Sequence, residues 1–351
     1  MTLREEFERR EANFLSVYGC QSAHTRGRAV PEAACPIRTA FQVDKDRILF
    51  SNAFRRLKLK TQVFLNPSGD EYRTRLTHTL EVAQIARTIA RAMFLNEDLA
   101  EAIALGHDLG HTPFGHGGEL VLKEIFSASF SHQAQGLRVV QVLENNGRGL
   151  NLTFEVRDGI VKHSKGYGKI MPDDPRELPV SMEGRVVRVA DIMAYLNHDL
   201  DDAIRSGVIC ETDIPGECTR VLGATHDARI TTMMADLIAQ SKPHDGQLVL
   251  NMGDTVYGAM TALRHFLYER VYRSPTVHNE FVKAKKIMSE LYAFLLEDES
   301  VLAEELARMR LPALTSTHCS RERMVCDLLA CMTDRYALSL YARTFFPAQM
   351  R

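Results

Sequence analysis

The chain has 351 residues, of which 45% are hydrophobic and 25% are charged, and its formal net charge is -2. This length and composition are typical of a folded protein with one large domain or two of ordinary size. The near-neutral charge excludes a global basic excess of the kind that binds nucleic acid or an anionic membrane. A nucleic-acid partner is therefore not indicated, and it would need a local basic patch.

Several signals that mark other compartments are missing from the sequence. Residues 1–13 are charged and contain no apolar core of the kind that a signal peptide needs. No apolar run approaches the roughly 20 residues that span a bilayer. The seven cysteines are odd in number and scattered, and none forms a Cys-x-x-Cys pair. This pattern favours reduced thiols in the cytoplasm over disulfides or a thiolate metal site.

Helix after helix is predicted along the chain. Apolar residues recur at helical spacing over residues 80–93, 99–105 and 186–204, and Gly207 ends the last of these stripes. Later helices are expected over residues 230–240, 254–272, 279–297 and 321–344. The modest strand candidates are residues 62–65 and 248–250, and loops are expected at residues 66–70 and 165–179. The fold class is therefore all-α.

A dense polar motif follows the second apolar stripe. From His107 to Glu119, three histidines, an aspartate and a glutamate fall within thirteen residues, together with four glycines and a proline. A helix cannot continue through Pro113 and these glycines, so the adjacent His107 and Asp108 are expected near a helix end. A single histidine is more often structural, but a folded core rarely tolerates so many polar groups together without a ligand.

Two further segments offer ligands that would complete a metal site. His78 begins one predicted helix, and Asp191 lies midway along the helix over residues 185–205. At about 100° per residue, Tyr195, His198 and Asp202 fall on the same side of that helix as Asp191. A polar stripe is usually a solvated face. This one is poor in lysine and glutamate, which favours the wall of an active site.

The order of these ligands resembles that of the HD superfamily, and the flanking sequence narrows the resemblance. Residues 36–48 and 54–64 are similar to amino-terminal signatures of the dNTP triphosphohydrolases, the deoxyguanosinetriphosphate triphosphohydrolase family. Residues 107–119 resemble that family's extended HD loop, and residues 188–191 with Tyr195 resemble its last ligand helix. The resemblance runs from about residue 30 to about residue 275. It implies an all-α HD-domain helical bundle with additional C-terminal helices.

The resemblance assigns the metal and the catalytic pair. It implies that a divalent ion is held by His78, His107, Asp108 and Asp191. Nitrogen and oxygen ligands without thiolate suit Mn²⁺, Mg²⁺, Fe²⁺, Co²⁺ or Ni²⁺ better than a structural zinc. His116 resembles the residue that moves a proton, and Glu119 is expected to hold its other ring nitrogen.

The resemblance also implies a nucleotide pocket. His111, His132 and Arg75 resemble phosphate contacts, Gln62 the residue that reads the sugar 3′-hydroxyl, and Val63 a neighbour of the base. Tyr195 resembles the aromatic residue that packs on the deoxyribose and excludes a 2′-hydroxyl. The remaining sugar and phosphate contacts expected from a looser alignment are Asp199, Arg264 and Tyr272.

The implied activity is hydrolysis of a dNTP at the α-phosphorus, which releases tripolyphosphate and a deoxynucleoside. Another HD phosphohydrolase, such as a nucleotide phosphatase or phosphodiesterase, is the main alternative. A nucleotide-sensing protein with little turnover is the other, although it would have no need of His116 and Glu119.

The expected organisation has three parts. Residues 1–60 form an N-terminal helical or oligomerisation segment, residues 61–207 the HD core, and residues 208–351 a C-terminal helical region that completes the pocket. Family members assemble into homo-oligomers, from dimer to hexamer, so the same is expected here. The basic run over residues 55–60 favours core packing or an oligomer interface over an allosteric nucleotide site, and nucleic acid is the least favoured reading.

Overall fold

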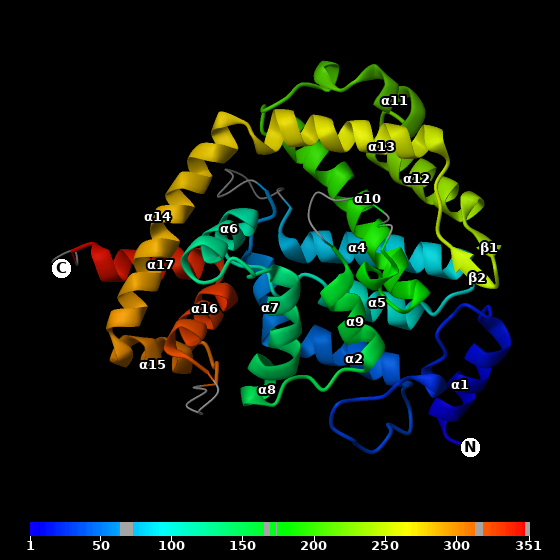
Figure 1. Cartoon of the computed structure of the whole chain (residues 1–351), viewed down its shortest axis with the longest axis horizontal. Coiled ribbons are helices and arrows are strands. Elements are labelled where there is room, and N and C mark those ends of the chain that lie inside the picture. Colours follow the sequence, from blue (N-terminus) through cyan, green and yellow to red (C-terminus); the bar gives the residue numbers. More distant parts are fainter. Residues whose placement is uncertain (64–72, 165–168, 171, 173, 313–318, 348–351) are drawn as a thin grey trace. The chain divides into compact units, whose positions relative to one another are not determined.

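The computed structural model describes residues 1–63, 73–164, 169, 170, 172, 174–312 and 319–347. The predicted all-α class is confirmed, because helices make up most of this part of the chain (Figure 1). Its one sheet is an antiparallel ribbon of β1 (Lys242–His244) and β2 (Gln247–Val249). No helix within the described residues is long and apolar enough to cross a membrane.

Two compact units divide the chain between them. The first unit comprises Met1–Leu49, Thr77–His107 and Asn151–Ser274, and the second comprises Phe50–Leu76, Asp108–Leu150 and Pro275–Arg351. The chain therefore passes from one unit to the other several times. Two of these passages lie within the expected functional motifs, one in the first turn of a helix before His78 and one between His107 and Asp108.

Helix α10 is central to the packing of the first unit, and contacts α5, α9, α12 and α13. Ser181 caps its start by accepting a hydrogen bond from the backbone of Gly184. The predicted apolar stripe from Val186 to Leu200 is buried. The helices of this unit are α1 (Leu3–Phe14), α2 (Ala40–Phe50), α4 (Arg75–Ala92), α5 (Glu97–Gly106), α9 (Phe154–Lys162), α10 (Met182–Arg205), α11 (Gly216–Leu222), α12 (His226–Gln240) and α13 (Asp254–Leu267).

Helix α14 organises the second unit, where it packs against α6, α15, α16 and α17. The unit's α-helices are α3 (Asn52–Arg56), α6 (Gly115–Ile125), α7 (His132–Arg138), α8 (Glu144–Gly147), α14 (Pro275–Glu297), α15 (Glu299–Arg308), α16 (Arg321–Cys331) and α17 (Asp334–Phe345). Shorter turns of 3₁₀ or π type in the two units are Ser22–His24, Leu57–Leu59, Val139–Leu143, Pro175–Glu177, Glu211–Asp213 and Tyr268–Tyr272.

Some predicted elements differ from the observed ones. The helix expected over residues 321–344 is two helices, because Thr333 is extended and caps α17 by accepting a hydrogen bond from the backbone of Tyr336. The helix expected over residues 254–272 ends as α13 at Leu267 and continues as a π turn. Gln62 and Val63 lie in no strand, and residues 64 and 65 and the loop at 66–70 lie outside the described residues. The strand expected at 248–250 is confirmed as β2.

Candidate functional site

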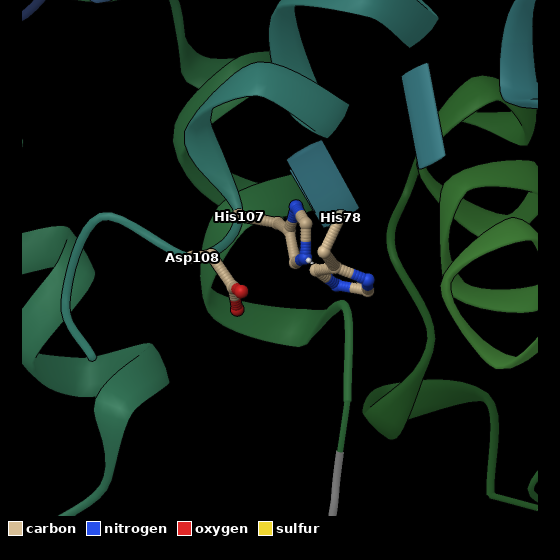
Figure 2. A group of neighbouring side chains, drawn as sticks. All are labelled: His78, His107 and Asp108. Carbon is tan, nitrogen blue, oxygen red and sulfur yellow. Dashed lines mark hydrogen bonds between the residues drawn. The ribbon is translucent and has the colours of Figure 1, made fainter. Parts of the chain in front are cut away.

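Two histidines and a carboxylate converge in the first unit. His78 lies in the first turn of α4, His107 directly follows α5, and Asp191 lies midway along α10. Nε2 of His78 is 3.2 Å from Nε2 of His107 and 3.3 Å from Oδ1 of Asp191, and His107 Nε2 is 3.9 Å from the same oxygen. Figure 2 shows the rings of His78 and His107 close together and edge to face, with Asp108 next to His107 in the chain.

In both histidines the second ring nitrogen, Nδ1, contacts another group of the protein. Nδ1 of His107 lies 2.6 Å from the carbonyl oxygen of Ala104. A carbonyl only accepts, so Nδ1 is the protonated nitrogen and, in the neutral ring, Nε2 carries the lone pair. Nδ1 of His78 lies 2.8 Å from Nε2 of His198. Such partners fix the tautomer and orientation of histidines that bind metals.

The charge of Asp191 complements these rings. Burial raises the pKa of its carboxyl, but the hydrogen bond with His78 and the charges of His107 and His78 outweigh burial and hold that pKa well below its usual range. The carboxylate is therefore ionised at neutral pH. Two imidazole nitrogens and an ionised carboxylate oxygen within 4 Å of one another form a donor set that suits a divalent cation.

Tyrosine and carboxylate side chains extend along α10 beyond Asp191. Burial raises the pKa of Tyr195, whose hydroxyl shares a hydrogen bond with Arg264 of α13. The hydroxyl of Tyr272 donates to Oδ2 of Asp199 across 2.5 Å. Tyr195 and Asp199 lie on the face of α10 that carries Asp191, and Arg264 and Tyr272 contact them there. The structure thus brings these four expected sugar and phosphate contacts together.

The HD loop of the second unit is built around a tight backbone turn. Phe114 and Gly115 both have positive φ, at 62° and 59°, directly before α6 begins. A Cβ at Gly115 would lie 2.7 Å from the carbonyl oxygen of Gln62, so only glycine allows this approach. At Gly110, a Cβ would lie 2.1 Å from the carbonyl oxygen of His132. These contacts bring the loop against the segments that carry Gln62 and His132.

Four of the expected ligand and phosphate residues cluster in the second unit. Asp108, His111 and His132 offer atoms within 4.8 Å of one another. The imidazoles of His111 and His132 are stacked with centroids 3.8 Å apart, and Nη1 of Arg75 donates to Oδ2 of Asp108 across 2.9 Å. Burial, with the charges of Arg75 and His132, holds the pKa of His111 well below its usual value.

Buried donors in this cluster point to an anionic ligand. Arg75 is 2% exposed, yet its Nε and Nη2 have no hydrogen-bond partner among the described residues. A buried guanidinium with unsatisfied donors is costly unless a ligand completes it. Its planar fork suits a phosphate or carboxylate.

The expected pairing of Glu119 with His116 differs from what the structure shows. Oε2 of Glu119 lies 2.7 Å from Nδ1 of His132, and Oε1 lies 2.9 Å from Nζ of Lys123. The hydrogen bond from His132 and its charge outweigh burial and hold the pKa of Glu119 well below its usual range. His116 is exposed on the first turn of α6, with its ring centroid 5.8 Å from that of His111. The three-residue spacing suggested the wrong histidine, because His132 approaches Glu119 from another helix, α7.

Comparison with known proteins places the chain in a family. Residues 75–196 match the HD domain, and residues 250–343 match the phosphohydrolase-associated domain. The chain is 60% identical, over the full length of both, to a deoxyguanosinetriphosphate triphosphohydrolase-like protein of Desulfatibacillum aliphaticivorans. It is 49% identical to one of Caldanaerobacter subterraneus subsp. tengcongensis, over 99% of this chain and 97% of that protein.

The chain belongs to the deoxyguanosinetriphosphate triphosphohydrolase-like family. The resemblance found in the sequence is thereby confirmed, and this family member is an HD phosphohydrolase. The HD domain match contains His78, His107, Asp108 and Asp191, and the His and Asp clusters described above fit the binding of a divalent metal. The second match continues to residue 343, beyond the point near residue 275 where the resemblance found in the sequence ends.

Two residues near the centre of this family member's site had no assigned role in the sequence. His198 was placed on the correct face of α10, but nothing local to it indicates that it holds His78. His163, at the end of α9, stands edge-on to His107 with centroids 5.0 Å apart. The residues around His163 in the sequence are typical of the end of any amphipathic helix and do not indicate a role. The contact with His107 follows from the packing of α9 on α5.

Proposed function

We propose that this chain is a divalent-metal-dependent dNTP triphosphohydrolase, which cleaves its substrate at the α-phosphorus to a deoxynucleoside and tripolyphosphate. The convergence of His78, His107 and Asp191 carries this proposal, since two oriented imidazoles and an ionised carboxylate are a metal-binding set. Asp108 would supply the fourth ligand. An ion held there, Mn²⁺, Mg²⁺, Fe²⁺, Co²⁺ or Ni²⁺, supplies positive charge that polarises a phosphoryl oxygen.

The protein's own cations would bind and orient the triphosphate. A triphosphate carries about four negative charges, which buried guanidinium and imidazole donors are suited to neutralise. Arg75 has two donor nitrogens without partners among the described residues, as such a role requires. His111 is proposed to contact the phosphates beside it. His132 stacks on His111 and would act beside it. This arrangement supports binding of the phosphates by the HD-loop cluster.

Proton transfer is assigned to His116. Water would attack the α-phosphorus as the bond from phosphorus to the sugar 5′-oxygen breaks, and that oxygen leaves with a proton. His116 is exposed and sits on the turn beside His111, so a substrate can reach its ring. Because Glu119 engages His132, we assign Glu119 to orienting His132 instead of His116.

The sugar would lie against α10. Tyr195 is proposed to pack on the deoxyribose and exclude a 2′-hydroxyl, with Gln62, Asp199 and Tyr272 at the other sugar positions. Arg264 shares a hydrogen bond with Tyr195, which supports a rigid wall there. Val63 is proposed to lie beside the base. We further propose that the enzyme is a cytoplasmic homo-oligomer.

Product analysis tests the proposal. The four dNTPs and GTP would be supplied singly and mixed, with Mn²⁺ or Mg²⁺, and nucleoside and tripolyphosphate would be measured together. We expect equimolar nucleoside and tripolyphosphate from at least one dNTP, and slower turnover of GTP than of dGTP. Orthophosphate or pyrophosphate as the product would indicate another HD phosphohydrolase. Nucleotide binding without turnover would indicate a sensor, and equal turnover of GTP and dGTP would remove the sugar role of Tyr195.

A further inference from the structure

One carboxylate in the C-terminal helices contacts two segments that the proposed site uses. Asp334 is the first residue of α17. Its Oδ2 accepts hydrogen bonds from the backbone N–H of Thr61 at 3.1 Å and from the Thr61 hydroxyl at 2.6 Å. Its Oδ1 accepts from the backbone N–H of Phe114 at 2.9 Å. Both oxygens are therefore engaged by donors outside α17.

The first of these segments leads directly to two proposed substrate contacts. Thr61 precedes Gln62 and forms a β-bridge with Thr74, the residue before Arg75. The backbone N–H of Arg75 also donates to the carbonyl oxygen of Lys60 across 3.0 Å. Asp334 thus holds a short backbone pairing from which the side chains of Gln62 and Arg75 project.

The second segment is the strained turn of the HD loop. Phe114 adopts a left-handed conformation that is unfavourable for a bulky side chain. Such strain persists only where the surroundings hold it, and it is common at functional sites. The hydrogen bond from Phe114 to Asp334 is one such restraint, two residues before His116.

A lysine provides a second link between the same parts of the chain. The Nζ of Lys60, which is buried, donates to the carbonyl oxygens of His111 and, at 2.9 Å, of Ala330. Ala330 lies in the last turn of α16, four residues before Asp334. Residues 330–334 therefore hold the HD loop at both His111 and Phe114.

We propose that Asp334 is a positioning residue, which fixes the HD loop and the segment of Gln62 and Arg75 relative to each other for turnover. The inference rests on the proposed function of those residues. Asp334 touches no reacting group and acts through the backbones of Thr61 and Phe114. The C-terminal helices would in this way form part of the catalytic apparatus of the second unit.

Substitutions at both ends of one hydrogen bond test the proposal. Asp334→Ala should lower kcat by about 10²-fold, the effect of a small misplacement of catalytic groups, and leave metal content unchanged. Thr61→Val keeps the side-chain shape and loses one hydrogen bond to a charged acceptor, so we expect a drop in kcat on the order of tenfold. Thr61→Ser keeps the hydroxyl and should retain wild-type kcat.

A double substitution and a control separate positioning from simple loss of stability. In the Asp334→Ala background, Thr61→Val should lower kcat no further, because the two residues act through one contact. Thr333→Ala removes the cap of the same helix without touching Thr61 or Phe114. It should lower the melting temperature and leave kcat unchanged.

Amide hydrogen exchange would measure the loosening of the HD loop without requiring turnover. Residues 111–118 should exchange faster in Asp334→Ala than in the wild type or in Thr333→Ala. Wild-type exchange there, or wild-type kcat, in a folded Asp334→Ala protein would overturn the proposal, as would equal losses of kcat in Asp334→Ala and Thr333→Ala. If the wild type turned over no nucleotide, the proposed function would fail, and the exchange rates would still decide the role of Asp334.

Discussion

Nδ1 of His78 lies 2.8 Å from Nε2 of His198, and both rings are buried within α4 and α10. On its other side, Nδ1 of His198 lies 2.8 Å from Oδ1 of Asp199, whose second oxygen accepts from the hydroxyl of Tyr272. The contact with His198 therefore holds the ring of the proposed metal ligand His78, and His198 lies next to Asp199 at the proposed sugar wall.

Removing the imidazole of His198 should weaken metal binding. His198→Phe keeps a ring of similar size but leaves Nδ1 of His78 without its hydrogen-bond partner, and loss of such partners costs about 10–100-fold in metal affinity. Calorimetric titration with Mn²⁺ would measure the change. His226→Phe is the matched control, since His226 also bonds to a side chain of α10, Asp201, on another part of the helix. Equal Mn²⁺ affinity in the two variants would refute the role of His198.

The helices and the candidate metal ligands are visible in the sequence, whereas the side chains that contact those ligands are not. The apolar stripe of α10 repeats at 3.6 residues, and the motif around His107 lies within one short segment, so both are visible locally. The contact between Glu119 and His132 joins α6 to α7, and spacing along one helix could not indicate it. Asp334 looks in sequence like an ordinary acidic residue in the first turn of a helix.

The carboxylate of Glu119 gives a second prediction. Glu119→Gln removes the charge that faces Nδ1 of His132 and allows the ring to change tautomer, so turnover should fall by about 10–100-fold. Because the pKa of Glu119 lies well below its usual range, the carboxylate stays ionised through the neutral range, and the loss should be similar from about pH 6 to about pH 8. Lys123→Gln removes the other, half-exposed partner of Glu119 and should change turnover little.

Lys60 should make the stability of the fold depend on pH. Burial lowers the pKa of its ammonium from 10.5 to about 7. Between these values the unfolded chain binds a proton that the folded chain has released, so unfolding takes up a proton and the free energy of unfolding rises with pH. Below that window both states are protonated, and the fold carries the full cost of burying the charge.

Replacing Lys60 isolates this contribution. Lys60→Met should flatten the rise in the free energy of unfolding between pH 7 and pH 10.5. The contribution is several kcal/mol at most, since one pKa unit corresponds to about 1.4 kcal/mol. Denaturant unfolding at a series of pH values would measure it, with the exposed Lys58→Met as the control. An unchanged pH slope in Lys60→Met would show that Lys60 stays charged in the fold.

The last prediction separates metal binding from proton transfer. Asp191→Asn and His107→Ala each remove one donor from the converging set of the first unit, so both should lose the metal. His116→Ala should keep metal and dNTP, because we assign no ligand role to its exposed ring. Its turnover should drop by roughly 10²–10⁴, the usual contribution of a positioned acid or base.

Three measurements on these variants decide the assignment: metal content by elemental analysis, dNTP affinity by calorimetry and tripolyphosphate release. If His116→Ala lost its metal, His116 would be a metal ligand, and its assignment to proton transfer would be wrong. If it kept full activity, proton transfer would pass to His111 or His132. Of these, His132 is the stronger candidate, because the carboxylate of Glu119 faces its Nδ1 at 2.7 Å and orients the ring. Burial and the charge of Arg75 disfavour the protonated form of His111.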